Sequence, residues 1–314
     1  MASIGIDIGG TRIKVGILKD GKLKTTSLYD VQYQNSLQKE LPHLESIINQ
    51  QIREHLDNEP LNGFGISLPC IVDSRNNMIL SNYIKFPDAT SLDLEHWVNK
   101  NWNTHLRLEN DARSALVGEW QYGAGQHINN LVMITLGTGL GSAVLIDGSI
   151  LRGHGHVAGN LAGHMTIDFQ GVVCNCGDIG CTEAVASTWS ISDNLEYFKT
   201  LFPDTDCINI PEIPDYQWVF NHAQSENPFA QWLRHRSLEA WSAMIKNLIY
   251  AYDPSLIILS GGLMGSEHMI VPYFQTKIKE YSWLNDRPVQ IKKAMHAEWA
   301  GVLGVAWLAG HSQN

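Results

Sequence analysis

The chain has 314 residues, of which 44% are hydrophobic and 17% charged, so it is long enough for two domains with sizeable cores and too apolar to be disordered. Its 22 Lys and Arg residues against 32 Asp and Glu residues give a formal net charge of −10, which disfavours a nucleic-acid partner. Apolar runs such as residues 131–136 are strand-sized, and no uninterrupted apolar run approaches the ~20 residues that span a bilayer. We therefore expect a soluble globular protein that binds neither nucleic acid nor membrane.

The first apolar runs predict two strands joined by a glycine turn. Alternating apolar positions over residues 4–8 and 13–17 flank Gly9-Gly10-Thr11. Asp7 lies at the end of the first strand and Lys14 on the second. The carboxylate can hold Mg²⁺ through water, the turn amides can approach phosphate oxygens, and the Lys can neutralise phosphate charge. Such turns also close plain hairpins, so this segment alone is compatible with a phosphate site or with a structural hairpin.

The same pattern recurs later in the chain. A shift of 127 residues places Gly10-Thr11 on Gly137-Thr138 and Asp20-Gly21 on Asp147-Gly148, with strand-like runs around both pairs. The shared spacing predicts a duplicated unit. An ATP bound between two lobes would explain why both turns, including Gly139, are rich in Gly and Thr.

The segment between the two turns predicts further elements in chain order. A helix is expected over residues 44–56 and a strand over 64–68. A strand over 106–108 precedes Glu109-Asn110-Asp111, and a helix follows over 112–122. Asp111 has two interpretations, because an Asp at a helix start is a common N-cap. It could instead be a general base that accepts the proton of an attacking hydroxyl, with Asn110 hydrogen-bonding the substrate.

The last third of the chain predicts two helices and one buried strand. Helical spacing runs from Leu238 to Tyr252, and the apolar residues 256–259 then enter Ser260-Gly261-Gly262, a third turn of the phosphate or nucleotide type. A Gly/Ala-rich helix over 298–309 is expected to pack closely on other backbone. We expect a smaller lobe of residues 1–112 with about 298–314, and a larger lobe of residues 113–297.

One His and three Cys side chains predict a structural zinc site. His164, Cys174, Cys176 and Cys181 supply N and S ligands, and the glycines of the C-x-C-G-x-x-G-C run let the backbone fold around one tetrahedral ion. The alternatives are a local disulfide and an accidental clustering of these residues. The chain begins without a basic, apolar signal segment, so we expect a cytoplasmic location with reduced thiols, which favours zinc. The metal would anchor a loop that presents Glu183 to the substrate.

These motifs together resemble the ROK family of sugar kinases. The resemblance is carried by D-x-G-G-T-x-x-K over residues 7–14, N-D-A over 110–112, L-G-T-G-x-G over 136–141, G-H at 163–164 and C-x-C-G-x-x-G-C-x-E over 174–183. It implies an α/β, two-lobed, actin-like ATPase fold of the hexokinase type, which is ribonuclease H-like and has an interdomain cleft. It also implies ATP and Mg²⁺ as cofactors, phosphorylation of a hexose or N-acetylhexosamine hydroxyl, and a homodimer.

The resemblance further implies roles for individual residues. Asp111 matches the catalytic base, and Gly261-Gly262 match the turn on the adenosine side. The sugar would be bound by, or lie beside, Asn110, His164 and Glu183, while His164 also joins the three Cys on zinc. The remaining nucleotide-side positions are Asp7, Gly9, Gly10, Thr11, Lys14, Gly137, Thr138 and Gly139.

Two departures from the family pattern bear on the substrate. Relatives carry E-x-G-H, whereas an ungapped match places Leu161 at the Glu position, and a leucine cannot accept a hydrogen bond from a sugar hydroxyl. The adjacent Asn160 is the candidate replacement. Arg113 stands where many relatives have Asn. Both departures leave the identity of the sugar open.

Two functional classes other than a kinase are compatible with part of the sequence. The family includes sugar-responsive repressors with an added helix-turn-helix, but the first strand is expected at about residue 3 and the net charge of −10 is unfavourable for DNA. A non-catalytic sugar sensor would explain Leu161. The presence of Asp7, Asp111 and both glycine turns favours an enzyme.

Overall fold

The computed structural model of the chain describes residues 2–33, 35–57, 59–205, 210–225, 227–281 and 289–311. The chain forms two compact units. The first unit comprises Met1–His127, Arg152–Ala158 and Met295–Asn314, and the second comprises Ile128–Leu151 and Gly159–Ala294. These bounds differ from the expected lobes chiefly because the helix after Asp111 packs on the C-terminal helix and so belongs to the first unit.

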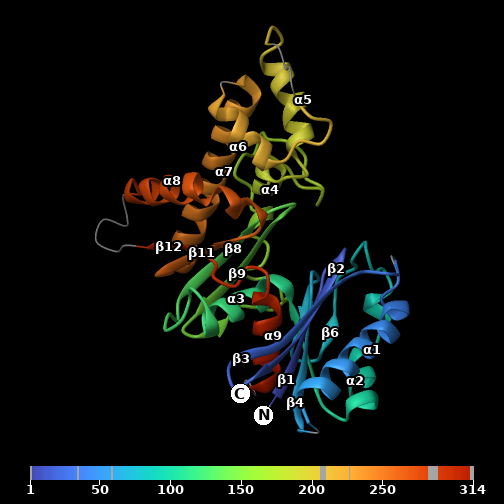
Figure 1. The fold of residues 1–314 in the computed structure, drawn as a ribbon. Helices are drawn as coiled ribbons and strands as arrows, with labels where there is room; N and C mark the ends of the chain where they lie inside the picture. The colour runs from blue at the N-terminus through green and yellow to red at the C-terminus, as the bar shows by residue number, and fades with distance from the viewer. Residues whose placement is uncertain are drawn as a thin grey trace. The chain divides into compact units, whose positions relative to one another are not determined.

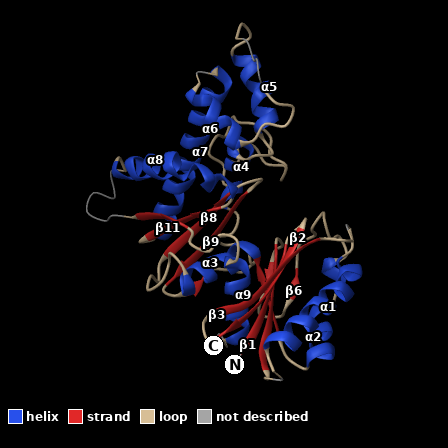
Figure 2. Ribbon diagram, in the orientation of Figure 1, coloured by secondary structure: helices blue, strands red, loops and turns tan. Residues whose placement is uncertain are grey.

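The first unit is built on a five-stranded sheet with helices on both faces (Figures 1 and 2). Its strand order is β3-β2-β1-β4-β7, in which the first three strands are antiparallel and β4 and β7 run parallel to β1. The strands are β1 (Ala2–Ile8), β2 (Arg12–Lys19), β3 (Lys22–Asp30), β4 (Leu61–Leu68) and β7 (Leu106–Asn110), with a separate pair β5 (Val72–Asp73) and β6 (Met78–Ile79). The helices are α1 (Leu37–His55), α2 (Leu94–Trp102), α3 (Asp111–Tyr122) and α9 (Ala300–Gly310), with a 3-10 turn η1 (Ala89–Ser91).

Strand alternation explains why the two faces of this sheet pack differently. The even-numbered Ile residues of β1 join Leu44 and Ile48 of α1 in one apolar core. On the opposite face, a Cβ on Gly65 would lie 2.1 Å from the backbone oxygen of Val305, so α9 lies directly on the sheet backbone. The predicted close packing of this Gly/Ala-rich helix is therefore confirmed.

The second unit repeats the sheet of the first. Its strand order is β10-β9-β8-β11-β12, again with three antiparallel strands followed by two parallel ones. In both sheets an Asp-Gly pair with positive φ joins the second strand to the third, with φ of 52° and 71° at Asp20-Gly21 and 49° and 73° at Asp147-Gly148. The predicted duplication is confirmed. The strands are β8 (Leu131–Leu136), β9 (Leu140–Ile146), β10 (Ser149–Ile150), β11 (Leu256–Ser260) and β12 (Gln290–Lys293).

The second unit has its own core around a long helix. Trp241 on α7 is fully buried, and its Nε1 donates to the carbonyl oxygen of Ala186 at 2.8 Å. Within the described ranges, no helix has both the length and the apolar character needed to cross a membrane. The helices are α4 (Thr182–Ala186), α5 (Ile191–Leu201), α6 (Tyr216–Gln224), α7 (Pro228–Tyr252) and α8 (Glu267–Lys279), with 3-10 turns η2 (Ala162–His164) and η3 (Gly262–Ser266).

Two expected helices are longer than their apolar spacing indicated. Helix α1 begins at Leu37 rather than at residue 44, because the Ser36 side chain accepts the N–H of Lys39 and caps the helix. Pro42 is accommodated inside it. Helix α7 begins at Pro228, a residue suited to the first helical position, where no N–H partner is needed.

Candidate functional site

The first unit brings Asp7 together with a hydroxyl and an ammonium group. The pairing of β1 with its neighbours places Lys14 and Ser67 directly beside Asp7. The Ser67 hydroxyl donates to Asp7 Oδ1 at 3.0 Å, and Lys14 Nζ lies 3.6 Å from Oδ2. The glycine turn follows at once, closed by a hydrogen bond from Gly9 N–H to the carbonyl of Arg12 at 3.0 Å. The expected Asp, turn and Lys thus form one cluster, while Thr11 in the same turn is exposed.

Asn110, and not Asp111, caps helix α3. Its Oδ1 accepts the backbone N–H groups of Ala112 and Arg113 at 3.0 and 3.2 Å, while its Nδ2 donates to the carbonyl of Cys70 at 3.1 Å and to Asp111 at 3.0 Å. The amide therefore uses both acceptor positions and both donors within the protein. A substrate contact from Asn110 therefore requires exchange of one of these hydrogen bonds.

The carboxyl group of Asp111 has a perturbed pKa. Its Oδ1 accepts from Ala112 N–H at 2.8 Å and from Asn110. Burial, reinforced by the negative charge of Asp7, raises the pKa of Asp111 to about 7 against the opposing effect of these hydrogen bonds. A carboxylate with this pKa is half deprotonated near neutral pH, as suits a general base.

Tyr83 and Lys85 also lie at the glycine turn, and sequence reasoning missed both. A Cβ on Gly10 would lie 2.2 Å from Tyr83 Oη and 2.8 Å from Lys85 Cγ, so these two side chains pack closely against the turn. Burial and the charge of Asp111 raise the pKa of Tyr83, which therefore remains a neutral hydroxyl at neutral pH. No spacing rule connects a loop residue to a turn more than 70 residues earlier, and the only sequence signal was a lysine in a short loop.

Arg113 belongs to a buried ion-pair network next to Asp111. Glu109 is fully buried, and its Oε2 pairs with Nη2 of Arg152. The other carboxylate oxygen of Glu109, Oε1, lies 4.0 Å from Arg113 Nη1. Arg113 Nη2 donates to the carbonyl of Ala158 at 3.0 Å. Burial lowers the pKa of Arg113, and the charge of Glu109 opposes that shift. This side chain therefore ties the segment Arg152–Ala158 to the start of α3.

In the second unit, Glu183 holds the other glycine turn. One carboxylate oxygen accepts the N–H of Leu140 at 2.7 Å, and the other accepts Trp189 Nε1 at 3.1 Å. A Cβ on Gly139 would lie 2.8 Å from the first oxygen, so glycine permits this contact. The turn is held from its other side by Thr188, which donates through its N–H and its hydroxyl to the carbonyl of Gly137 at 3.1 and 3.0 Å.

The third predicted turn lies beside the second. Because β8 and β11 are parallel neighbours, their carboxyl ends meet at one edge of the sheet. Gly261 has φ of +96°, and a Cβ there would lie 2.2 Å from the carbonyl oxygen of Leu136, the residue that precedes Gly137. A Cβ on Gly262, by contrast, would meet nothing within 4 Å. Backbone groups from Gly137–Thr138–Gly139 and Gly261-Gly262 therefore line one edge.

The predicted metal ligands converge within the second unit. The ligand atoms of His164, Cys174, Cys176 and Cys181 all lie within 4.8 Å of one another. The Cys176 and Cys181 sulfurs are 3.7 Å apart, and Cys174 Sγ lies 3.7 Å from His164 Nδ1. Tetrahedral zinc with bonds of about 2.3 Å to sulfur and 2.0–2.1 Å to nitrogen separates such pairs by about 3.8 and 3.6 Å. The four residues therefore fit one Zn²⁺ ion.

Local backbone geometry and acidity are consistent with that fit. Gly177 and Gly180 adopt φ of +96° and +69°, and a Cβ on Gly180 would overlap the carbonyl oxygen of Asp168. Burial and the neighbouring thiols raise the pKa of Cys181 to about 12. Thiolates at this position therefore need a bound cation to form near neutral pH.

The structure distinguishes Asn160 from Leu161. The Leu161 side chain is 40% exposed, whereas Oδ1 of Asn160 is buried and has no hydrogen-bond partner among the described residues. A buried, unpaired carbonyl oxygen is an acceptor for a ligand hydroxyl. Of these two neighbours, Asn160 therefore has an unused acceptor, whereas the Leu161 side chain has none.

The chain is similar in sequence and in fold to several known proteins. A model of the ROK family matches residues 3–312. The glucokinase of Thermotoga maritima is 31% identical over 310 residues, covering 96% of this chain and 95% of the relative. The xylose repressor of Bacillus subtilis is 27% identical, covering 90% of this chain and 71% of the repressor. A ROK family glucokinase from Streptomyces griseus, solved with glucose and AMPPNP, has a TM-score of 0.72 at 24% identity, covering 98% of this chain and 99% of that one. The fold is the two-lobed actin-like ATPase fold of the ROK sugar kinases.

Proposed function

Because the chain belongs to the ROK family, we propose that it is an ATP-dependent kinase that phosphorylates a hydroxyl of a hexose or N-acetylhexosamine. The observation that carries the proposal is the state of Asp111. Burial and the charge of Asp7 raise the pKa of Asp111 to about 7, and a hydrogen bond from Asn110 holds its carboxylate in place. The similarity to the Thermotoga maritima glucokinase and the glucose and AMPPNP bound to the Streptomyces griseus enzyme support this class of reaction.

In this reaction Asp111 accepts the proton of the attacking sugar hydroxyl. General-base assistance of this kind contributes about 10²- to 10⁴-fold to the rate. ATP would supply the phosphoryl group, and a bound Mg²⁺ would neutralise the charge that develops on it. Asp7 is suited to hold the metal through water, and Lys14 is suited to balance the phosphate charge. The Ser67 hydroxyl fixes the Asp7 carboxylate by donating a hydrogen bond to it.

Backbone amides are proposed to hold the nucleotide. The turn Gly9-Gly10-Thr11 in the first unit and the turn Gly137–Thr138–Gly139 in the second are assigned to the phosphates. Gly261-Gly262 are assigned to the adenosine side, where the open space at Gly262 leaves room for a ligand. Glu183 fixes the second turn through Leu140 N–H.

The sugar is proposed to contact Asn110, Asn160, His164 and Glu183. The amide oxygen of Asn160 replaces the carboxylate that relatives have nearby, so one sugar hydroxyl meets a neutral acceptor. A hydrogen bond to a charged group contributes about 1.5–3 kcal/mol, against about 0.5–1.5 kcal/mol for a neutral pair. Glucose is therefore expected to be a poorer substrate for this chain than a sugar whose hydroxyl at that position is absent, epimeric or substituted.

The test of this specificity compares two neighbouring substitutions. Asn160→Ala should lower kcat/KM for the best sugar, because it removes the buried unpaired acceptor that we assign to the sugar. Leu161→Glu tests the ungapped alignment, and a gain in kcat/KM for glucose would assign the role to position 161 instead. No change from Asn160→Ala would exclude Asn160 from the sugar contact.

We also propose one structural Zn²⁺ per chain, bound by His164 and the three Cys, and a cytoplasmic homodimer. The zinc proposal rests on the distances between the four ligand atoms. The dimer rests on the family resemblance alone, and light scattering should give twice the chain mass of 35.1 kDa. A monomer at micromolar concentration would contradict it.

A coupled ADP-release assay across hexoses and N-acetylhexosamines tests the proposed activity. Sugar-dependent ADP release by the full chain is the expected result. The second candidate, a sugar-sensing protein without catalysis, predicts sugar binding by calorimetry with no ADP release above the rate without sugar. The repressor class, represented among the relatives by the xylose repressor, predicts sugar-sensitive binding to DNA instead.

A further inference from the structure

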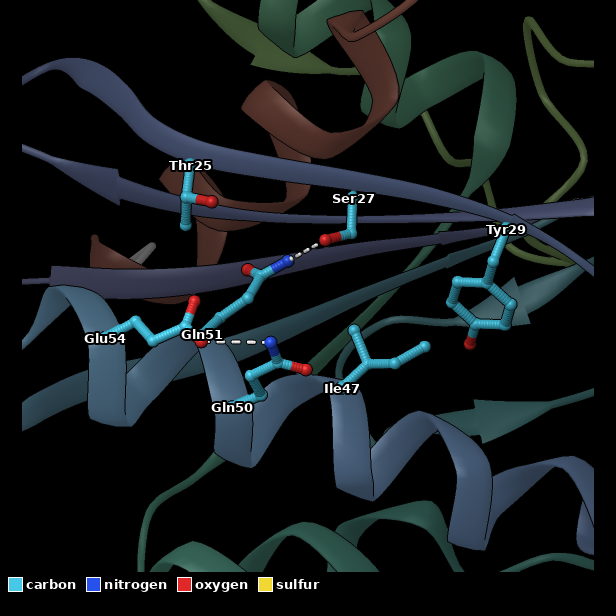
Figure 3. A pocket seen from close by; sticks show the side chains of 7 residues that line it. All are labelled: Thr25, Ser27, Tyr29, Ile47, Gln50, Gln51 and Glu54. Carbon is cyan, nitrogen blue, oxygen red and sulfur yellow. Dashed lines mark hydrogen bonds between the residues drawn. The ribbon is translucent and has the colours of Figure 1, made fainter.

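The first unit contains a groove that the proposed kinase reaction does not use. It lies between strand β3 and helix α1, as Figure 3 shows, and has a volume of about 270 Å³. This volume is slightly below the roughly 300–1,000 Å³ of sites for drug-sized ligands, so the groove suits a smaller molecule. Its lining residues are Thr25, Ser27, Tyr29, Ile47, Gln50, Gln51 and Glu54.

Regular secondary structure places these side chains opposite one another. Thr25, Ser27 and Tyr29 alternate along β3 and share the face that looks toward α1. The helix contributes a stripe at spacings of three, four and seven residues from Ile47. An interface between a helix and a sheet normally buries apolar side chains, yet six of these seven side chains carry a polar group.

Gln51 has an acceptor that the protein leaves unused. The residue is only 4% exposed, and its Nε2 donates to Ser27 Oγ at 2.7 Å, a bond drawn in Figure 3. Its Oε1 is buried and has no hydrogen-bond partner among the described residues. Leaving a buried amide oxygen unpaired is costly, so such an atom in a groove indicates a ligand or solvent partner.

Tyr29 supplies an unused hydroxyl at the other end of the groove. Its ring packs edge-on against His43 with 5.0 Å between centroids, and its Oη is buried without a partner in the described part of the chain. Burial, with the charge of Glu40, raises the pKa of Tyr29. The side chain therefore presents a neutral hydroxyl that can donate and accept.

The charges at the groove disfavour an anionic ligand. Among the lining residues the charged one is Glu54, whose carboxylate accepts Gln50 Nε2 at 2.9 Å. A phosphate or carboxylate would meet this negative charge without a lining cation to offset it. Hydroxyl groups, by contrast, can donate to Gln51 Oε1 and pair with the hydroxyls of Thr25 and Tyr29.

We propose that this groove binds a small, neutral, polyhydroxylated molecule of monosaccharide or cyclitol size. The site is separate from the residues assigned to phosphoryl transfer, and the inference does not depend on the kinase activity. Ile47 supplies the apolar contact that a carbohydrate ring commonly uses alongside its hydrogen bonds. Water molecules on the same two atoms are the competing explanation, and binding measurements distinguish the two.

The experiment follows the side-chain amide signals of Gln50 and Gln51 by NMR on the labelled full chain. Myo-inositol is the principal probe, because it presents hydroxyls around the whole ring and carries no charge, and D-glucose and D-glucose 6-phosphate are added separately. Saturable shifts of the Gln51 amide are expected with the two neutral probes and not with the phosphate. Shifts with the phosphate alone would overturn the assignment of a neutral ligand.

Two substitutions, each with a matched control, locate the binding. Gln51→Leu and Tyr29→Phe should each weaken myo-inositol binding about three- to tenfold, the effect of one lost neutral hydrogen bond. The controls make the same chemical changes outside the groove: Gln38→Leu on the exposed side of α1 and Tyr33→Phe beyond the end of β3. Both controls should leave the affinity for myo-inositol unaltered. Thr25→Val serves as a further variant if Gln51→Leu does not fold.

Two results would overturn the proposal. One is the absence of any Gln50 or Gln51 shift with neutral probes up to about 100 mM, which would mean a groove filled by solvent only. The other is equal affinity for myo-inositol in the groove variants and in the wild type, which would place the binding elsewhere on the protein.

Discussion

The acidity of Asp111 depends on burial and on the neighbouring Asp7, and both raise its pKa. The opposing hydrogen bonds come from Ala112 N–H and the Asn110 side chain. Asn110 also caps α3, so the same side chain fixes the helix start and the carboxylate. One local arrangement therefore determines both the position of the proposed base and the pH range in which it is ionised.

Asp111→Asn should lower kcat by about 10²- to 10⁴-fold while the fold is retained, because the amide cannot accept the proton. The folded-state pKa of about 7 lies above the ordinary value of 3.8, so the folded protein binds more protons than the unfolded chain between these pH values. This group therefore lowers the stability as pH rises through that window. The variant should melt at or above the wild-type temperature at pH 7.5, and near-normal turnover would reduce Asp111 to a structural residue.

The pH profile of kcat/KM should report the same group. A base must be deprotonated to act, so the acidic limb should rise with pH and bend near the Asp111 pKa of about 7. The Asp93→Asn variant, which alters the cap of α2, should keep this limb. A profile that is flat from pH 5 to 8 would show that the base has an ordinary carboxylate pKa of about 4, or that proton transfer does not limit the rate.

The residues of the site were predictable to different degrees. Asp7, Lys14, the glycine turns and the proposed zinc ligands are each recognisable from residues close together in the sequence. Tyr83 and Lys85 were not, because their position over Gly10 depends on how a loop folds onto the sheet. Asn160 was a candidate from its place beside Leu161, but the sequence does not show that its oxygen is buried and unpaired.

At the scale of single elements, the turn after β11 offers a matched pair of glycines. Gly261→Ala would place a Cβ 2.2 Å from the carbonyl oxygen of Leu136 at φ of +96°, whereas Gly262→Ala meets nothing within 4 Å. Backbone strain of this kind costs about 1–3 kcal/mol. Gly261→Ala should lower the melting temperature by several degrees and Gly262→Ala should not. Equal melting temperatures would mean that the turn adapts without strain.

The metal-binding loop makes a second prediction at this scale. The purified protein should contain about one zinc ion per chain, and Cys176→Ser should lose it together with much of the sugar affinity, because the loop carries His164 and leads into Glu183 on α4. Cys70→Ser removes a thiol that is buried in the first unit and should retain the metal. Elemental analysis provides the measurement, and a fully active preparation without metal would contradict the prediction.

At the scale of the whole molecule, the repeated sheet was visible in the sequence as a spacing of motifs. The shift that aligned the two Gly-Thr turns also aligned the two Asp-Gly turns, and both pairs connect equivalent strands. The unit bounds were harder to predict. Arg152–Ala158 joins the first unit partly through buried Arg113, and helix α3 joins it through α9, neither of which is a local property of the sequence.

The central claim is that the chain transfers the γ-phosphoryl group of ATP to a sugar hydroxyl. The most direct measurement uses ATP labelled with ³²P at the γ position and follows the label by chromatography after incubation with a panel of hexoses and N-acetylhexosamines. We predict label on at least one sugar with the wild type, and at least about a hundredfold less with Asp111→Asn. Sugar binding by the folded wild type with no labelled sugar phosphate would contradict the account.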